Sequence, residues 1–214
     1  MSAKTSHNTP DAEKVDYDLE AEKLFKKLNN ISDEDDSRTS RYRDLDPLYE
    51  DPTTGAVVYV GAKMAADNLK TLGKHSIRHI VNCTNRQKLT FQEVEGFQYY
   101  RFTPATWRML GLKGDVEILG FVDEMMDFVD QALGKGENVL IHCLAGAHRA
   151  GTTGVLVLMA KMKYDSRNAT KVAQKLRPVI NPFGPLKDLL SRVDTAIINL
   201  NGSSKLKETN RWYR

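Results

Sequence analysis

A cysteine and an arginine with five residues between them, Cys143 and Arg149, stand inside an apolar part of the chain. Residues 139–142 are mostly apolar, as in a short buried strand, and residues 152–162 are apolar nearly all round, as in a buried helix. A strand that runs through a tight loop into a helix leaves the loop amides pointing inward, and such N–H groups at a helix N-terminus bind anions. The spacing therefore predicts a phosphate-binding loop.

Arg149 and Cys143 give this loop its expected chemistry. The planar guanidinium of Arg149 is suited to closing on a phosphate with two charge-assisted hydrogen bonds. The same positive field favours the thiolate form of Cys143, and a thiolate beneath a bound phosphate is a nucleophile directed at phosphorus. The predicted reaction is phosphoryl transfer to Cys143 and hydrolysis of the phosphocysteine; the alternative is an inert buried cysteine. The expected phosphate-binding residues are Leu144, Ala145, Gly146, Ala147, His148 and Arg149.

The sequence around this loop resembles a known family. His142-Cys143 followed by five residues and Arg149 is similar to the active-site loop of the cysteine-dependent phosphatases. Flanking segments narrow the resemblance to the dual-specificity phosphatase branch: residues 59–61 (YVG), 66–68 (ADN), 78–83 (RHIVNC), 128–133 (FVDQAL) and 177–182 (RPVINP). The resemblance covers roughly residues 48–200. It implies an α/β fold with a mostly parallel central sheet flanked by helices on both faces, which the alternation of expected strands and helices also favours.

The resemblance also assigns roles near the loop. His142 is similar to a histidine that orients the loop and supports the thiolate. Cys83 follows a neighbouring strand, and some members of the family use such a cysteine to trap the oxidised nucleophile as a reversible disulfide. The alternative for Cys83 is a small buried apolar side chain.

The general acid departs from the family pattern. The family places an aspartate on the loop after the strand at residues 98–102, where it protonates the leaving oxygen and then activates water. Here Thr106 or Trp107 occupies that place, and Asp115 is the only carboxylate in residues 103–115. Asp115 is therefore the candidate acid, with the N-cap of the following helix as the alternative. An enzyme without an acid would still cleave aryl phosphates, whereas its hydrolysis of alkyl phosphates would be slowed most.

Ala150 is a second departure, because most of the family has Ser or Thr directly after the arginine. That hydroxyl stabilises the sulfur as it leaves in the second step. Either Thr152 or Thr153 replaces it, or hydrolysis is slow. Arginine followed by alanine also resembles the glucan phosphatase branch, although no carbohydrate-binding module is evident.

Two groups of side chains are expected near the pocket. Trp107 and the apolar residues after it form either an apolar rim over the site or ordinary packing. Four basic residues either bind acidic side chains that flank the phosphorylated residue of a substrate or are solvated: Arg86, Lys88, Arg101 and Arg108.

Charge is unevenly distributed along the 214 residues. The net charge is +3, but residues 1–51 carry 8 Lys and Arg against 14 Asp and Glu, whereas residues 52–214 carry 23 against 14. We therefore expect an acidic N-terminal extension with one helix (1–47), a phosphatase-like domain (48–200) and a polar basic tail (201–214). Helical periodicity at residues 11–30, with Leu19 among the inward positions, favours a helix that docks on the domain over one that binds a partner.

Three further helices have recognisable ends. Residues 62–72 are expected to form a single helix that ends at Gly73. Ser166 is the expected cap of the helix that follows it, and Pro185 is expected to open the last helix.

Two cysteines give neither a disulfide framework nor a zinc quartet, and a reactive thiolate needs a reducing compartment. No apolar run suggests a signal peptide or a membrane span. We expect a cytoplasmic or nuclear protein with no cofactor, no metal, and no nucleic acid or membrane partner; the oligomeric state is not predicted. The predicted function is dephosphorylation of phosphotyrosine and phosphoserine or phosphothreonine in proteins. The alternatives are a catalytically weak phosphoprotein-binding module and a glucan phosphatase.

Overall fold

The computed structural model describes residues 15–29, 43–201 and 211–212. Its centre is a five-stranded sheet in the order β1-β2-β5-β3-β4. Only the β1–β2 pair is antiparallel among these strands. The strands are β1 (Leu45–Glu50), β2 (Val57–Gly61), β3 (Ile77–Asn82), β4 (Gln98–Arg101) and β5 (Asn138–His142). The mostly parallel sheet predicted from the sequence is therefore confirmed.

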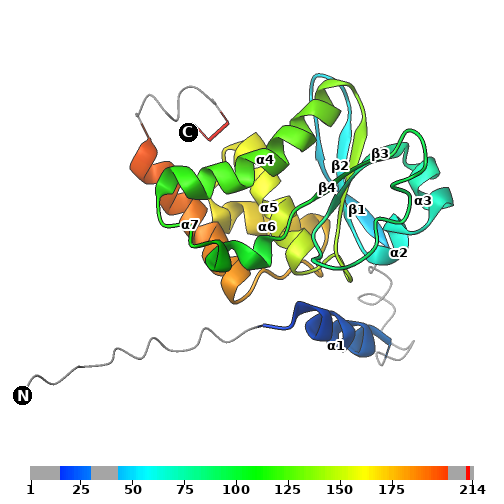
Figure 1. The fold of residues 1–214 in the computed structure, drawn as a ribbon, viewed down its shortest axis with the longest axis horizontal. Helices are drawn as coiled ribbons and strands as arrows, with labels where there is room; N and C mark the ends of the chain where they lie inside the picture. The colour runs from blue at the N-terminus through cyan, green and yellow to red at the C-terminus, as the bar shows by residue number, and fades with distance from the viewer. Residues whose placement is uncertain (1–14, 30–42, 202–210, 213–214) are drawn as a thin grey trace, which may run out of the picture.

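Helices cover both faces of the sheet, as predicted (Figure 1). The larger core lies between the sheet and the four long helices α4 (Asp115–Gly134), α5 (Arg149–Met162), α6 (Ser166–Leu176) and α7 (Pro185–Leu200). The smaller core lies on the opposite face, beneath α2 (Lys63–Ala66) and α3 (Leu69–Lys74). A 3-10 helix (Pro104–Leu110) joins β4 to α4. Because α5 is apolar on all sides, it lies in the middle of the larger layer with twelve of its residues buried.

The helix ends follow ordinary capping chemistry. The Glu117 carboxylate accepts hydrogen bonds from the amides of Lys113 and Gly114 at the start of α4. Pro185 opens α7, as predicted. Asp165, and not Ser166 as the sequence suggested, caps α6 by accepting from the Asn168 amide.

The helix expected at residues 62–72 is two short helices, so that prediction was wrong. The chain breaks at Asp67 and Asn68, and the Asn68 side chain accepts from the Thr71 amide to cap α3. Gly73, the expected end of the single helix, lies inside α3. A cap within an otherwise helical pattern therefore outweighed the periodicity.

The predicted N-terminal helix is α1 (Tyr17–Asn29), shown in blue in Figure 1, and it docks on the domain. Its buried residues are Tyr17 and Ala21, whereas Leu19, which the periodicity placed on the inner face, is 48% exposed. Residues 11–14 and 30 of the expected helix lie outside the described residues.

The sheet begins at Leu45, ahead of the domain start expected at residue 48. Part of the expected tail also joins the domain: Trp212 is buried, and Arg211 pairs with Asp123, Asp127 and Asp130 on α4. Within the described residues, no helix is both long and apolar enough to cross a membrane.

Candidate active site

The 143–149 loop lies at the carboxyl edge of the parallel strands, where ligands bind in sheets of this kind. His142, the last residue of β5, sits between Gly61 of β2 and Asn82 of β3, and both of those strands also end there. Arg149 is the first residue of α5. The loop therefore joins a buried strand to a buried helix, as the sequence predicted.

Four consecutive carbonyl groups of the loop are held from outside it. The Leu144 oxygen accepts from the Lys63 amide at 3.0 Å, and the Ala147 oxygen accepts from the Asn181 amide at 3.0 Å. The Ala145 and Gly146 oxygens accept from the guanidinium of Arg177 at 3.1 and 3.0 Å. In a planar trans peptide the N–H points opposite to the C=O, so the amides of residues 145–148 point into the loop. This orientation is what an anion site requires.

Gly146 permits the close packing behind the loop. Its φ is +66°, and a Cβ there would lie 2.5 Å from the carbonyl oxygen of Gly61 and 2.8 Å from Nη2 of Arg177. Any larger residue would push the loop away from β2 and displace the guanidinium that orients its carbonyls.

Arg149 brings a buried positive charge to the mouth of the loop. Its side chain is 7% exposed, and its Nη2 donates to the carboxylate of Asp18 on α1. Its Nε is buried and has no hydrogen-bond partner among the described residues. A buried guanidinium N–H without a partner costs free energy, so this donor is suited to a bound anion.

Cys143 and His142 are both buried, at 2% and 3% exposure. Burial lowers the pKa of His142 to about 4, against the opposing pull of the Asp67 carboxylate, so the ring is neutral at neutral pH. A neutral ring directly before Cys143 fits the expected orienting role and not that of a cationic partner. That role stays a prediction.

The structure does not bring Asp115 to the loop. Its carboxylate accepts from Arg192 at 2.5 Å and from Asn199 at 3.0 Å, both on α7. These two bonds lower the pKa of Asp115, which keeps it ionised and tied to α7. Asp115 is also the first residue of α4 rather than its cap, which is Gly114. The arrangement argues against both expected roles, the acid and the N-cap.

Thr106, one of the two residues expected at the family's acid position, makes local bonds in the 3-10 helix. Its hydroxyl donates to the Thr103 carbonyl at 2.8 Å and lies 2.9 Å from the Thr103 hydroxyl. Trp107 is buried and donates to the Pro185 carbonyl, so it packs against α7 instead of forming a rim. Neither residue offers an acidic proton.

The hydroxyls that were expected to replace the one missing at Ala150 are used within α5. Thr152 donates to the His148 carbonyl and Thr153 to the Arg149 carbonyl, each one turn back. Thr153 also lies 3.3 Å from the sulfur of Cys83. Burial raises the pKa of the Cys83 thiol, which favours the reading of Cys83 as a small buried side chain.

Two of the four basic residues expected near the pocket, Arg101 and Arg108, make contacts within the protein. Arg101 donates to the carbonyls of Thr84 and Gln87 and so shapes that loop, and Arg108 pairs with Asp188. Arg86 and Lys88 are exposed.

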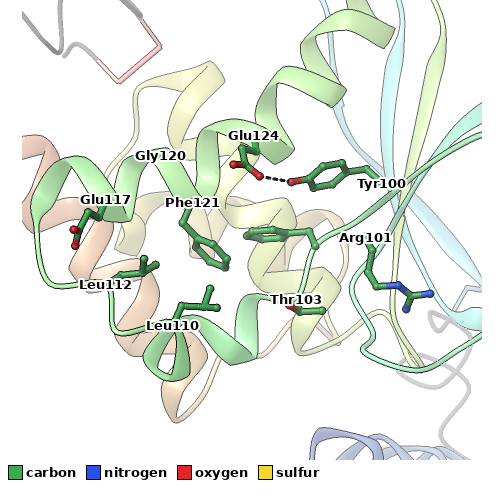
Figure 2. A pocket seen from close by; sticks show the side chains of 10 residues that line it. Tyr100, Arg101, Thr103, Leu110, Leu112, Glu117, Gly120, Phe121 and Glu124 are labelled. Carbon is green, nitrogen blue, oxygen red and sulfur yellow. Dashed lines mark hydrogen bonds between the residues drawn. The ribbon is translucent and has the colours of Figure 1, made fainter.

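A pocket of about 510 Å³ lies between β4, the 3-10 helix and α4 (Figure 2). Leu110, Leu112 and Phe121 point into it, and Glu124 on its rim accepts from the Tyr100 hydroxyl. Neither Cys143 nor Arg149 lines this pocket. This pocket is therefore separate from the 143–149 loop, which carries the predicted catalytic residues.

Arg177 and Asp18 are the functional candidates that the sequence did not reveal. Arg177 lies in a segment that resembles the family, but its contacts with the loop carbonyls depend on the fold. Asp18 meets Arg149 across 131 residues of sequence, and no local pattern encodes that contact. Among the described residues, no cluster of three or more His, Cys, Asp or Glu side chains is placed to hold a metal ion.

The fold and the loop define the class of protein: an α/β domain with a cysteine and an arginine at the two ends of the loop between β5 and α5. A family model described as the dual specificity phosphatase catalytic domain matches residues 58–194. The chain therefore belongs to the dual specificity phosphatase family, as the sequence resemblance indicated.

Curated relatives agree with this assignment. Human dual specificity protein phosphatase 9 is 31% identical over 58% of this chain and 31% of its own length. Human dual specificity protein phosphatase 6 is 28% identical over 77% of this chain and 40% of its own. The chain thus spans less than half the length of these relatives.

The fold is also that of solved family structures. Human DUSP28 superposes with a TM-score of 0.58 at 17% identity, covering 73% of this chain and 96% of that one. DUSP15 gives a TM-score of 0.53 at 22% identity, covering 71% and 88%.

Proposed function

We propose that this chain is a phosphoprotein phosphatase that works through a phosphocysteine on Cys143. The proposal rests chiefly on one observation: the 143–149 loop has its carbonyls held outward and a buried Arg149 N–H without a partner among the described residues. Membership of the dual specificity phosphatase family supports the same reaction.

The reaction has two steps. The Cys143 sulfur attacks phosphorus, an S–P bond forms, and the P–O bond to the leaving group breaks. Water then attacks the phosphocysteine, which releases inorganic phosphate and regenerates the thiolate. Arg149 and the inward amides stabilise the charge on the transferring oxygens in both steps. A reducing compartment, the cytoplasm or the nucleus, suits a thiolate of this kind.

We propose phosphotyrosine in proteins as the preferred substrate, with phosphoserine and phosphothreonine turned over more slowly. Neither Asp115 nor Thr106 supplies a proton at the loop. An aryl oxide leaves without a proton far more readily than an alkoxide, so the missing acid penalises phosphoserine most. Ala150 adds slow hydrolysis of the phosphocysteine.

The test is hydrolysis of an aryl phosphate against pH by wild type, Cys143→Ser and Asp115→Asn. We expect Cys143→Ser to abolish turnover and Asp115→Asn to leave the pH profile unchanged, because its carboxylate faces α7. Phosphotyrosine and phosphoserine peptides and a phosphorylated glucan are compared under the same conditions.

The outcomes separate the alternatives. Absence of wild-type turnover, with inorganic phosphate still bound, would favour a phosphoprotein-binding module. Release of phosphate from the glucan in preference to the peptides would favour the glucan phosphatase. An activity that survives Cys143→Ser would refute the thiolate mechanism.

A further inference from the structure

The first turn of α1 lies across the mouth of the 143–149 loop. The Asp18 carboxylate accepts a hydrogen bond from Nη2 of Arg149, although Asp18 itself remains 54% exposed. A carboxylate and a phosphate present the same kind of oxygens to a guanidinium. Asp18 therefore uses an N–H that a substrate phosphate would need.

Further contacts seat α1 on the same surface. Ala21 is 2% exposed and packs on Ala145 and Ala147 of the loop, with Leu24 and Phe25 beside them. These apolar contacts lie directly over the loop residues whose amides point inward.

Tyr17 fixes the start of the helix. It is 6% exposed, its hydroxyl donates to the Phe183 carbonyl at 3.2 Å, and its ring lies 5.3 Å from that of Phe183. Tyr17 also reaches His148, the residue before Arg149, at 6.3 Å between ring centroids. Helix α1 thus contacts the loop at Ala145 and Ala147, and again at His148.

The covered loop is closed in this arrangement. Cys143 and Ala147 are 2% and 0% exposed while α1 lies on the loop, so little of the sulfur is open to solvent in this arrangement. The contact of α1 with the domain is nevertheless small, since Tyr17 and Ala21 are the only buried side chains among the described residues of α1. An exposed carboxylate and two buried side chains form a contact that can open.

We propose that α1 is an internal competitor of substrate, in which Asp18 stands in for a phosphate oxygen on Arg149. This inference rests on the proposed function and concerns the regulation of the same site. Because substrate binds only molecules from which α1 is released, the apparent affinity for phosphate is the intrinsic affinity multiplied by the fraction of molecules that are open. Release of α1 lowers KM and leaves kcat unchanged, because the chemical groups are the same in every open molecule.

The experiment compares four full-length proteins: wild type, Asp18→Asn, Ala21→Gln and Glu22→Gln. Asp18→Asn removes the charge that pairs with Arg149, and Ala21→Gln wedges the helix off the loop alanines. Glu22→Gln, at an exposed carboxylate of the same helix, removes the same charge without that contact and is the matched control. Each protein is assayed for kcat and KM on an aryl phosphate. The rate at which iodoacetamide alkylates Cys143 is measured by peptide mass, with Cys83 as the internal reference.

We expect KM to fall about tenfold in Asp18→Asn and Ala21→Gln, as for a wild type that is open about a tenth of the time. Alkylation of Cys143 should accelerate to the same extent, and inorganic phosphate should protect it. Glu22→Gln should behave as wild type. Raising the salt concentration should narrow the gap between wild type and Asp18→Asn, since the pair is partly exposed.

Alkylation does not depend on turnover, so the two proposals fail separately. Faster alkylation in both variants without hydrolysis in any protein would refute the phosphatase and leave the competitor standing. Equal KM and equal alkylation in all four proteins would overturn the competitor. A loss of kcat in Asp18→Asn would also overturn it, because Asp18 would then be the missing acid.

Discussion

Arg177 and Asp46 form a buried ion pair directly behind the 143–149 loop. The guanidinium donates to the Asp46 carboxylate at 2.6 Å, and the two side chains are 1% and 8% exposed. The same guanidinium donates to the carbonyls of Ala145 and Gly146. Asp46 thus fixes Arg177, and Arg177 fixes the peptide planes that turn the loop amides inward.

Removing the carboxylate should therefore cost both stability and activity. We expect Asp46→Asn to lower the free energy of unfolding by about 3–5 kcal/mol, because it leaves a buried guanidinium without its counter-charge. Chemical denaturation measures the stability, and the KM for an aryl phosphate reports the loop. Arg43→Gln is the control, since Arg43 is 73% exposed and meets Asp46 only at 4.0 Å. Equal effects of the two substitutions would contradict the argument.

A carboxylate placed at position 106 should supply the missing proton. Within the described part of the chain, the Thr106 hydroxyl is engaged only with Thr103, so its loss costs little. We expect Thr106→Asp to raise hydrolysis of a phosphoserine peptide by about 10²-fold and to add an alkaline limb to its pH profile. The rate for an aryl phosphate with a good leaving group should change little. An equal gain on both substrates would point to an effect on binding and not to acid catalysis.

A hydroxyl at position 150 should accelerate the second chemical step. Thr152 and Thr153 give their hydroxyl protons to carbonyls within α5, so neither hydroxyl proton is left to replace that of the missing group at Ala150. We expect Ala150→Ser to shorten the life of the phosphocysteine and to reduce the burst of leaving group seen before steady turnover. Rapid-mixing kinetics on an aryl phosphate measure the burst. Thr152→Val, which removes a hydroxyl without changing position 150, should leave the burst unchanged.

Local patterns predicted the strands, the loop and most helices because those features depend on residues near one another in the chain. The apolar run before Cys143 and the continuous apolar character of α5 are examples, and both appear where expected. The prediction of one helix across α2 and α3 was wrong because the single cap at Asn68 outweighed a weak periodicity.

The parts of the site that escaped prediction are held by long-range contacts. Asp115 was the only carboxylate in its segment, but its role depends on Arg192, which lies 77 residues away. Arg177 and Asp18 act on the loop across the fold, and neither has a local pattern that shows its target. Sequence spacing therefore predicted a nucleophile and a phosphate clamp at Cys143 and Arg149, whereas the groups that hold or cover these residues required the tertiary structure.

Protonation of His142 should lower the stability of the folded protein in acid. Burial holds its pKa at about 4, below the ordinary value of 6.5, against the Asp67 carboxylate and together with the nearby charges of Lys63 and Arg101. Between pH 6.5 and about pH 4, His142 is therefore protonated in the unfolded chain and neutral in the folded protein. The contribution is fully present above pH 6.5 and is lost as the pH falls through about 4.

Between pH 7 and pH 4.5 this one group should remove about 2 kcal/mol from the free energy of unfolding. Urea denaturation of wild type and His142→Asn at both pH values isolates the contribution, since the other titrating groups are common to the two proteins. A fall in stability of the same size in both proteins would assign the acid sensitivity to other groups.

Cys83 should stay a thiol when the protein is oxidised. Its amide donates to the His142 carbonyl, so it lies beside the segment that carries Cys143, and its sulfur lies 3.3 Å from the Thr153 hydroxyl. Burial raises the pKa of this thiol, and a disulfide forms only by attack of a thiolate.

We therefore expect peroxide to add oxygen at Cys143 without forming a bond to Cys83. Intact mass and peptide mapping distinguish the two results, because a disulfide lowers the mass by two hydrogens whereas a sulfenic or sulfinic acid raises it by oxygen. Asp18→Asn provides the stringent case, since an uncovered Cys143 reacts with peroxide fastest. A Cys83–Cys143 disulfide in that variant would show that Cys83 becomes ionised despite its burial, and would make it the redox partner of the nucleophile.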